Sequence, residues 1–144
     1  MIIILPLQDT GTNVLLLPRS LMTTIEASMC TMVSSAKCKT LWAKTDNCVA
    51  LTAAEIATFP SMILNLENSV DLHMSSRDYL LQGSPTCSVA GQYALGIRDG
   101  GSAGGSGFII GDTTMRNYYL VFDLAQKKIG WGPVNKATCG NIEK

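Results

Sequence analysis

The chain is poor in charged, aromatic and histidine residues. Only 15% of its 144 residues are charged, and aromatic residues make up 6%. Eleven basic residues balance eleven acidic ones, so the sequence offers no excess positive charge to neutralise phosphates, which argues against a nucleic-acid-binding protein. The hydrophobic fraction of 47% excludes a disordered chain, which combines high charge with few apolar residues. A single folded domain of ordinary size is expected.

Long apolar runs and metal-binding clusters are also missing. The longest apolar run, Met1 to Leu7, is interrupted by Pro6 and is much shorter than the roughly 18 residues of a membrane span. No basic residue precedes it, so it lacks the first part of a signal peptide. It is typical of a buried β-strand, and a domain that starts inside such a strand suggests that upstream sequence is missing. No cysteines have C-x-x-C spacing, and His73 is the one histidine, so neither a metal nor another cofactor is expected.

Apolar spacing predicts one longer helix and several strands. The helix is expected over Pro18 to Ser34, because six residues there recur on one helical face. They are Leu21, Met22, Ile25, Met29, Met32 and Val33. Because its methionines share this face, they are interpreted as core residues rather than as ligands of a soft metal. The segment 35–47 is expected to be a polar connection, and 52–58 a short helical turn.

The second half of the chain has the two-residue period of β-strands. Met62 to Leu66 and Val70 to Met74 alternate apolar and polar residues around a turn at 67–69, which predicts a hairpin. His73 falls on its polar face, where a solvated histidine is expected. The glycine-rich loop 99–107 lacks the residues that end a phosphate-binding loop and is interpreted as a hairpin tip. A further hairpin is expected from Tyr118 to Trp131.

Four short motifs follow one another along the chain. Asp9-Thr10-Gly11-Thr12 comes directly after the first apolar run, and taken alone it is more typical of a turn or helix-capping aspartate than of a catalytic one. Phe108-Ile109-Ile110-Gly111-Asp112 lies far downstream, and Asp112 is expected to cap a helical turn. Arg116-Asn117-Tyr118-Tyr119-Leu120-Val121-Phe122-Asp123 and Ile129-Gly130-Trp131 then complete the series, with Asp123 starting the last hairpin turn.

The order of these motifs resembles the C-terminal lobe of the pepsin-like aspartic proteases. The segments Phe59 to Leu64 and Ser76 to Leu80 also fit that family, and the resemblance covers about Ile2 to Pro133. It implies a mostly β fold, namely one lobe of the bilobal pepsin-like acid protease fold with one or two short helices. Residues 1–144 would then form a single lobe, truncated at its N-terminus.

The resemblance also assigns roles to individual residues. It makes Asp9 this lobe's catalytic carboxylate and Thr10 the hydroxyl that links the two loops across the lobe interface. Gly11 would allow the tight turn, and Thr12 would donate a hydrogen bond to the Asp9 carboxylate. The remaining implied site residues are the substrate-pocket candidates Asn13 and Ile109 and the pair Ile110 and Gly111, which threads under the loop.

Several departures from the family pattern bear on activity. Only one Asp-Thr/Ser-Gly motif is present, whereas these enzymes bring together one from each lobe. The expected function is therefore half of an aspartic endopeptidase site, whose other half lies on a missing N-terminal lobe. The substrate would be a peptide or protein, and the chain would be inactive unless it is paired. A homodimer in which each copy supplies Asp9 remains open, and so does a non-catalytic peptide-binding or inhibitor lobe.

Five cysteines leave one without a partner inside the chain. By resemblance, Cys48 and Cys87 form a disulfide. Cys30 and Cys38 are close enough in sequence to form a second one, and the partner of Cys139 is expected in the missing upstream part. These pairings imply an oxidising route through the secretory pathway, to a vacuole, a lysosome or the cell exterior.

Overall fold

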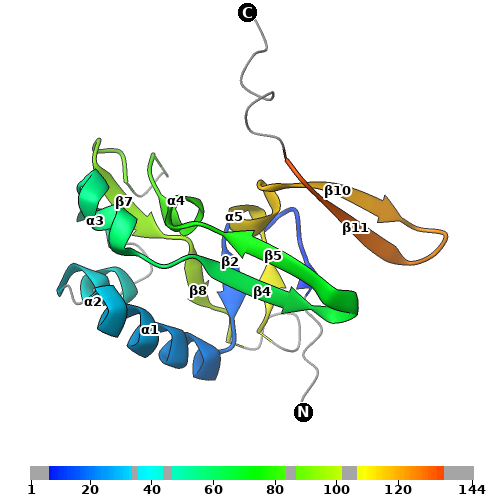
Figure 1. The fold of residues 1–144 in the computed structure, drawn as a ribbon, viewed down its shortest axis with the longest axis horizontal. Coiled ribbons are helices and arrows are strands. Elements are labelled where there is room, and N and C mark those ends of the chain that lie inside the picture. The colour runs from blue at the N-terminus through cyan, green and yellow to red at the C-terminus, as the bar shows by residue number, and fades with distance from the viewer. Residues whose placement is uncertain (1–6, 34–35, 44–46, 84–86, 102–106, 135–144) are drawn as a thin grey trace, which may run out of the picture.

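The computed structural model describes residues 7–33, 36–43, 47–83, 87–101 and 107–134, and its centre is a four-stranded sheet (Figure 1). Its strand order is β1-β9-β2-β8. The strands are β1 (Leu7–Gln8), β9 (Ile109–Ile110), β2 (Leu15–Leu17) and β8 (Ile97–Asp99). Strand β9 is parallel to β1 and antiparallel to β2. The chain segment joining β1 to β2 must therefore cross the end of β9.

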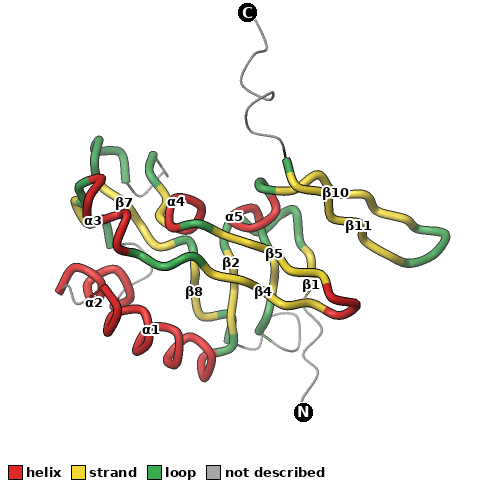
Figure 2. Tube along the Cα trace, viewed as in Figure 1, coloured by secondary structure: helices red, strands yellow, loops and turns green. Residues whose placement is uncertain are grey.

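Three smaller antiparallel sheets surround this centre. One contains β3 (Val49–Ala50), β7 (Gln92–Leu95) and β6 (Leu80–Leu81). The expected hairpin is present as β4 (Met62–Leu66) and β5 (Val70–Met74), joined by the 3-10 turn η1 (Glu67–Ser69). The last hairpin consists of β10 (Tyr118–Asp123) and β11 (Lys128–Pro133). It projects at the opposite end of the molecule from helices α1 (Arg19–Val33) and α2 (Ala36–Ala43) (Figure 2). Asp123 accepts a hydrogen bond from the Gln126 N–H at 2.9 Å in its turn, as expected.

The mostly β fold is confirmed, although the described residues contain five α-helices rather than one or two. The longest is α1 (Arg19–Val33), which confirms the helix expected from the apolar stripe. The others are α2 (Ala36–Ala43), α3 (Ala53–Thr58), α4 (Ser76–Tyr79) and α5 (Asp112–Met115).

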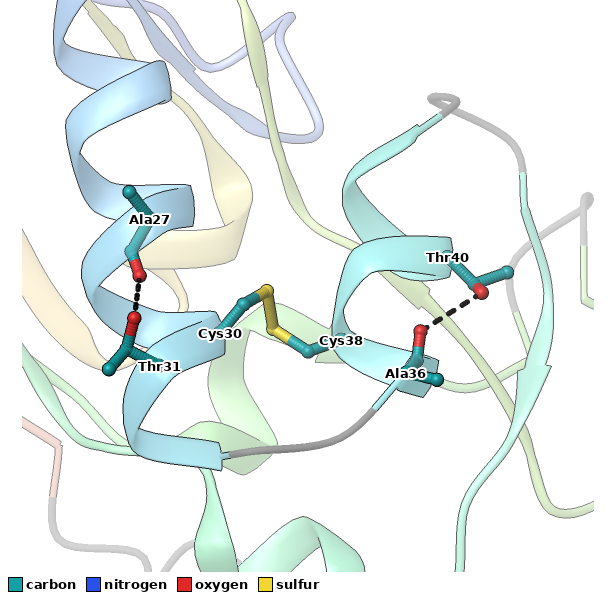
Figure 3. The surroundings of a disulfide bond; sticks show 6 residues. All are labelled: Ala27, Cys30, Thr31, Ala36, Cys38 and Thr40. Carbon is teal, nitrogen blue, oxygen red and sulfur yellow. Dashed lines mark hydrogen bonds between the residues drawn. A yellow bond between two sulfur atoms is a disulfide. The ribbon is translucent and has the colours of Figure 1, made fainter.

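Helix α2 corrects the expectation of a polar connection over 35–47. So short a helix is marginal in water by itself. Here Cys38, Leu41 and Trp42 lie on one face and are buried, and the Cys30–Cys38 disulfide joins α2 to α1 (Figure 3). Tertiary contacts and the disulfide therefore stabilise this helix, which the polar composition of the segment does not predict.

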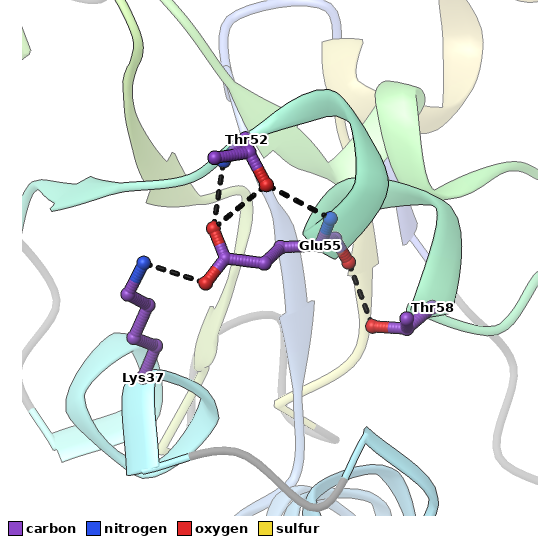
Figure 4. Close-up of polar contacts among 4 residues, drawn as sticks. All are labelled: Lys37, Thr52, Glu55 and Thr58. Carbon is purple, nitrogen blue, oxygen red and sulfur yellow. Dashed lines mark hydrogen bonds and ion pairs between the residues drawn. The ribbon is translucent and has the colours of Figure 1, made fainter.

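Helix α3 begins with a capping box that also binds α2 (Figure 4). The Thr52 hydroxyl accepts a hydrogen bond from the Glu55 N–H at 3.2 Å, while the Glu55 carboxylate accepts one from the Thr52 N–H at 2.8 Å. Lys37 of α2 forms an ion pair with the same carboxylate at 2.6 Å. This ion pair and then the Thr52 N–H lower the pKa of Glu55 to about 2.

Both expected disulfides are present. Cys30–Cys38 has a Cα–Cα distance of 5.4 Å, and Cys48–Cys87 has one of 5.6 Å. The second closes a segment with a sequence separation of 39, which includes β4 and β5. In the chain-entropy treatment, closing a loop of that length stabilises the fold by about 4 kcal/mol. Cys139 lies outside the described residues.

Two properties of the described segments bear on function. None of their helices is long and apolar enough to cross a membrane. Within the same segments, no group of three or more histidine, cysteine, aspartate or glutamate side chains is arranged to hold a metal ion.

Candidate active-site loop

Asp9 lies at the end of β1, on a tight loop that crosses the end of β9. Its N–H donates to the Ile110 carbonyl oxygen at 3.1 Å, which continues the pairing of β1 with β9. The Thr12 N–H donates to the Asp9 carbonyl oxygen at 3.1 Å and closes the turn. The first and second sequence motifs, far apart in the chain, therefore meet at this loop.

Gly111 lies directly beneath the loop, where no side chain fits. A Cβ at this position would be 2.2 Å from the Thr12 carbonyl oxygen and 2.4 Å from that of Val14. The N–H groups that follow bind the loop from below. Asp112 donates to the Thr12 carbonyl oxygen at 2.8 Å, and Thr113 donates to that of Asn13 at 3.1 Å. The backbone around Gly111 thus fixes the height of the loop above the sheet.

The Asp9 carboxylate is held by two hydrogen bonds from its own loop. The Thr12 hydroxyl donates to Oδ2 at 2.6 Å, and the Gly11 N–H donates to Oδ1 at 2.9 Å. Because both donors favour the ionised form, chiefly Thr12 and then Gly11, they lower the pKa of Asp9 below its ordinary value. Asp9 forms no ion pair with another described residue. Its carboxylate is therefore fixed and charged, on a half-buried side chain.

The other expected site residues divide into exposed and buried positions. Thr10, Gly11 and Asn13 are exposed, and the Thr10 hydroxyl has no hydrogen-bond partner within the described segments. Ile109 is only 7% exposed and Ile110 is fully buried. Ile109 belongs to β9, the strand between β1 and β2, and its burial leaves little of its side chain open to a substrate.

Helix α5 contains supporting residues that sequence reasoning missed. Thr113 is fully buried, and its hydroxyl donates to the Asn13 carbonyl oxygen at 2.9 Å. Thr114 is also fully buried and donates to the Met74 sulfur at 3.1 Å. The signal in the sequence was a pair of hydroxyl residues directly after the apolar-apolar-Gly-Asp motif, since a hydroxyl that becomes buried there needs a hydrogen-bond partner.

Asp112 does not cap α5, which corrects the expectation from the sequence. Gly111 occupies the cap position and makes no side-chain hydrogen bond, while Asp112 is the first helical residue. The closeness of the loop explains the difference, since it excludes any side chain from the position at which a capping aspartate would stand.

Two comparisons with known proteins bear on the family of the chain. The family model described as eukaryotic aspartyl protease matches residues 4–134. Pepsin A of Sus scrofa is 29% identical over 126 residues, which cover 88% of this chain and 29% of that protein. The chain therefore spans less than a third of the length of this relative. The two disulfides and the family fit a protein of the secretory pathway or the cell exterior. With the family model matching most of its length, the chain belongs to the eukaryotic aspartyl protease family.

Proposed function

We propose that this chain supplies one half of the catalytic site of an aspartic endopeptidase, with Asp9 as its carboxylate. The observation that carries the proposal is the arrangement of Asp9 itself. Two donors fix its oxygens at 2.9 and 2.6 Å, and the loop that holds it is exposed and supported from below by Gly111. A turn aspartate also accepts from the N–H two residues on, but it needs neither the second donor, Thr12, nor the close support of the loop by Gly111.

The chemistry requires a second carboxyl group beside Asp9. Two close carboxyl groups cannot both ionise readily, so they share one proton, as the paired aspartates of aspartic proteases do. The hydrogen bonds from Thr12 and Gly11 favour Asp9 as the ionised member. Asp9 then removes a proton from a bound water, which attacks the peptide carbonyl carbon. The protonated partner donates to the developing oxyanion.

The second carboxyl group comes from outside this lobe. The sequence has a single Asp-Thr/Ser-Gly motif. Among the described residues, hydrogen bonds from Thr12 and then Gly11 lower the pKa of Asp9, and no neighbouring carboxylate raises it. We place the partner on an N-terminal lobe of the complete enzyme, with residues 1–144 as the C-terminal lobe. Within the described segments the hydroxyl of exposed Thr10 has no hydrogen-bond partner, which fits a contact across the boundary between the lobes.

The neighbouring residues have secondary roles in this proposal. Gly11 and Thr12 hold the Asp9 carboxylate, and Ile110 and Gly111 hold the loop. Exposed Asn13 fits a contact with the substrate chain. Ile109 is buried and supports the site as part of strand β9. The substrate is a peptide or protein, and the place of action is a vacuole, a lysosome or the cell exterior.

Sedimentation combined with a peptide-cleavage assay at acid pH tests where the partner carboxylate comes from. We expect the isolated chain to be a monomer without activity, and the chain recovered with a second lobe from its native host to cleave peptides. An active dimer of the isolated chain would instead assign both carboxylates to two copies of Asp9.

A non-catalytic peptide-binding or inhibitor lobe is the second candidate, because a single carboxylate cannot form the dyad. It predicts that material recovered from the host binds peptides or a protease but never cleaves them. Cleavage by that material, dependent on Asp9, excludes this candidate.

A further inference from the structure

Thr113 lies under the Asp9 loop and has no exposed surface. It is the second residue of α5, which Figure 1 shows at the start of β2. Its hydroxyl donates to the Asn13 carbonyl oxygen at 2.9 Å, and its N–H donates to the same oxygen at 3.1 Å. Because a carbonyl oxygen has two lone pairs, Thr113 satisfies the Asn13 carbonyl group completely and holds it in two directions.

Gly96 leaves the space in which the Thr113 hydroxyl lies. It stands between β7 and β8, and its carbonyl oxygen accepts from the N–H of Leu15, the first residue of β2, at 2.9 Å. A Cβ at position 96 would be 2.9 Å from the Thr113 hydroxyl oxygen, closer than the roughly 3.3 Å of an ordinary C···O contact. The hydroxyl is therefore enclosed between Gly96 on one side and the Asn13 carbonyl group on the other.

Two successive carbonyl groups of the loop are bound to the first turn of α5. The Asp112 N–H donates to the Thr12 carbonyl oxygen at 2.8 Å, and Thr113 binds the next carbonyl group along the chain, that of Asn13. On its other side, Thr12 donates its N–H to the Asp9 carbonyl oxygen at 3.1 Å. The backbone of Thr12 is therefore held both before and after its Cα atom.

The Thr12 side chain connects this backbone to the carboxylate. Its hydroxyl donates to Asp9 Oδ2 at 2.6 Å. Because a β-branched side chain has few χ1 rotamers, the direction of this hydroxyl follows the position of the Thr12 backbone. A displacement of Asn13 would therefore move the donor away from Oδ2.

We propose that Thr113 is a positioning residue for the Asp9 carboxylate. Its hydroxyl fixes the backbone at Asn13, and thereby the Thr12 hydroxyl that donates to Oδ2. The same contact turns the Asn13 carbonyl group inward, while the Asn13 residue remains exposed on the loop. The inference deepens the proposed function, and its consequence for catalysis rests on that function.

The charged groups around the loop leave the ionisation of Asp9 as a direct measure of this contact. Strands β1, β2 and β9 contain no charged residue, and α5 contains Asp112, which is exposed. The hydrogen bond from Thr12 is the largest cause of the lowered pKa of Asp9, followed by that from Gly11, and no charged residue of the described segments contributes. The pKa of Asp9 therefore depends chiefly on where the Thr12 hydroxyl lies.

A carboxyl carbon NMR titration of the full chain tests the proposal. Thr113→Val places a methyl group where the hydroxyl now lies 2.9 Å from the Asn13 carbonyl oxygen, although a C···O contact needs about 3.3 Å. Asn13 and Thr12 must then move, and we expect the pKa of Asp9 to rise because Oδ2 loses its donor. The rise should be smaller than that caused by Thr12→Val, which removes the donor itself.

Two further replacements separate the hydrogen bond from the packing of the side chain. Thr113→Ala removes the hydroxyl without placing a methyl group against Asn13, and it should also raise the pKa of Asp9. Thr113→Ser keeps the hydroxyl and removes only the methyl group, so it should leave this pKa at the value of the parent chain.

Thr114→Val is the matched control in the same helix. Thr114 is also fully buried, but its hydroxyl donates to the Met74 sulfur at 3.1 Å and not to the loop. If buried hydroxyl groups of α5 only stabilised the fold, Thr113→Val and Thr114→Val would act alike. We expect Thr114→Val to leave the pKa of Asp9 unchanged, and circular dichroism verifies that each variant is folded.

The titration needs no cleavage, so it decides on Thr113 even if the assembled protein cleaves no peptide. In an active enzyme, the same rise in pKa should move the acidic limb of the pH–rate profile of Thr113→Val to higher pH, because Asp9 acts in its ionised form. An unchanged pKa of Asp9 in Thr113→Val and Thr113→Ala would overturn the proposal. An equal rise in Thr114→Val, or a rise in Thr113→Ser as large as in Thr113→Ala, would overturn it as well.

Discussion

Gly111→Ala should distort the loop that holds Asp9. The added Cβ would lie 2.2 Å from the Thr12 carbonyl oxygen and 2.4 Å from that of Val14, whereas C···O contacts are ordinarily about 3.3 Å or longer. Both neighbours are backbone atoms, and neither can rotate away. The loop must therefore rise by about 1 Å, which is more than the range of about 0.5 Å over which N–H···O hydrogen-bond distances vary.

The cost can be worked out from the contacts that this movement disturbs. Overpacking costs about 1–3 kcal/mol. The hydrogen bonds from Asp112 and Thr113 to the loop, at 2.8 and 3.1 Å, contribute about 1 kcal/mol each. The sum, about 3–5 kcal/mol, is a large part of the total stability of a typical domain.

Urea denaturation followed by tryptophan fluorescence measures the change in the free energy of unfolding. Gly132→Ala in β11 is the matched control, since its Cβ would meet nothing closer than 3.9 Å. We expect the control to stay within about 0.5 kcal/mol of the parent chain. A Gly111→Ala variant as stable as Gly132→Ala would refute the described support of the loop.

Three further predictions concern groups whose partners the structure identifies. Thr12→Val removes the 2.6 Å hydrogen bond to Asp9 and should raise the pKa of Asp9, measured by carboxyl carbon NMR; an unchanged or lower pKa would contradict the assigned contact. Replacing Cys48 and Cys87 together by serine should lower the free energy of unfolding by about 4 kcal/mol, against about 2.5 kcal/mol for Cys30 and Cys38, because the longer loop regains more entropy; urea denaturation measures both, and a reversed order would count against this explanation. The pKa of Glu55 is lowered from 4.5 to about 2, so its contribution to stability is present above its unfolded value and lost as the pH falls towards 2. In an NMR titration Lys37→Met should raise that pKa, and no rise would exclude Lys37 as its main cause.

The elements that the sequence predicted well are those with a clear period. The stripe from Leu21 to Val33 predicted α1, and the two-residue alternation predicted β4 and β5. Helix α2 was missed although Cys38, Leu41 and Trp42 have helical spacing. Three apolar positions are too few to distinguish a helix from a loop in the sequence. The packing against α1 and the disulfide, which decide the matter, are known only from the structure.

The candidate site was predictable only in part. The order of the motifs placed the Asp9 loop beside Ile110 and Gly111, and the hydrogen bonds between them confirm that they meet. The burial of Thr113 could not be derived from periodicity, because its hydroxyl is satisfied by a carbonyl 100 residues away along the chain. The close approach of the loop to Gly111 also joins segments that are far apart in the sequence. It makes Gly111, and not Asp112, the cap residue of α5, and this could not be predicted from the sequence.

The most direct test of the central claim is peptide cleavage by the assembled enzyme carrying Asp9→Asn. An asparagine cannot ionise or share the proton of the dyad, so we expect the rate at acid pH to fall by about 100-fold or more. Glu67→Gln is the matched control, because it also neutralises a carboxylate, on the exposed turn between β4 and β5. We expect the control to cleave like the parent enzyme and Asp9→Asn to lose this activity. Undiminished cleavage by Asp9→Asn would contradict this expectation.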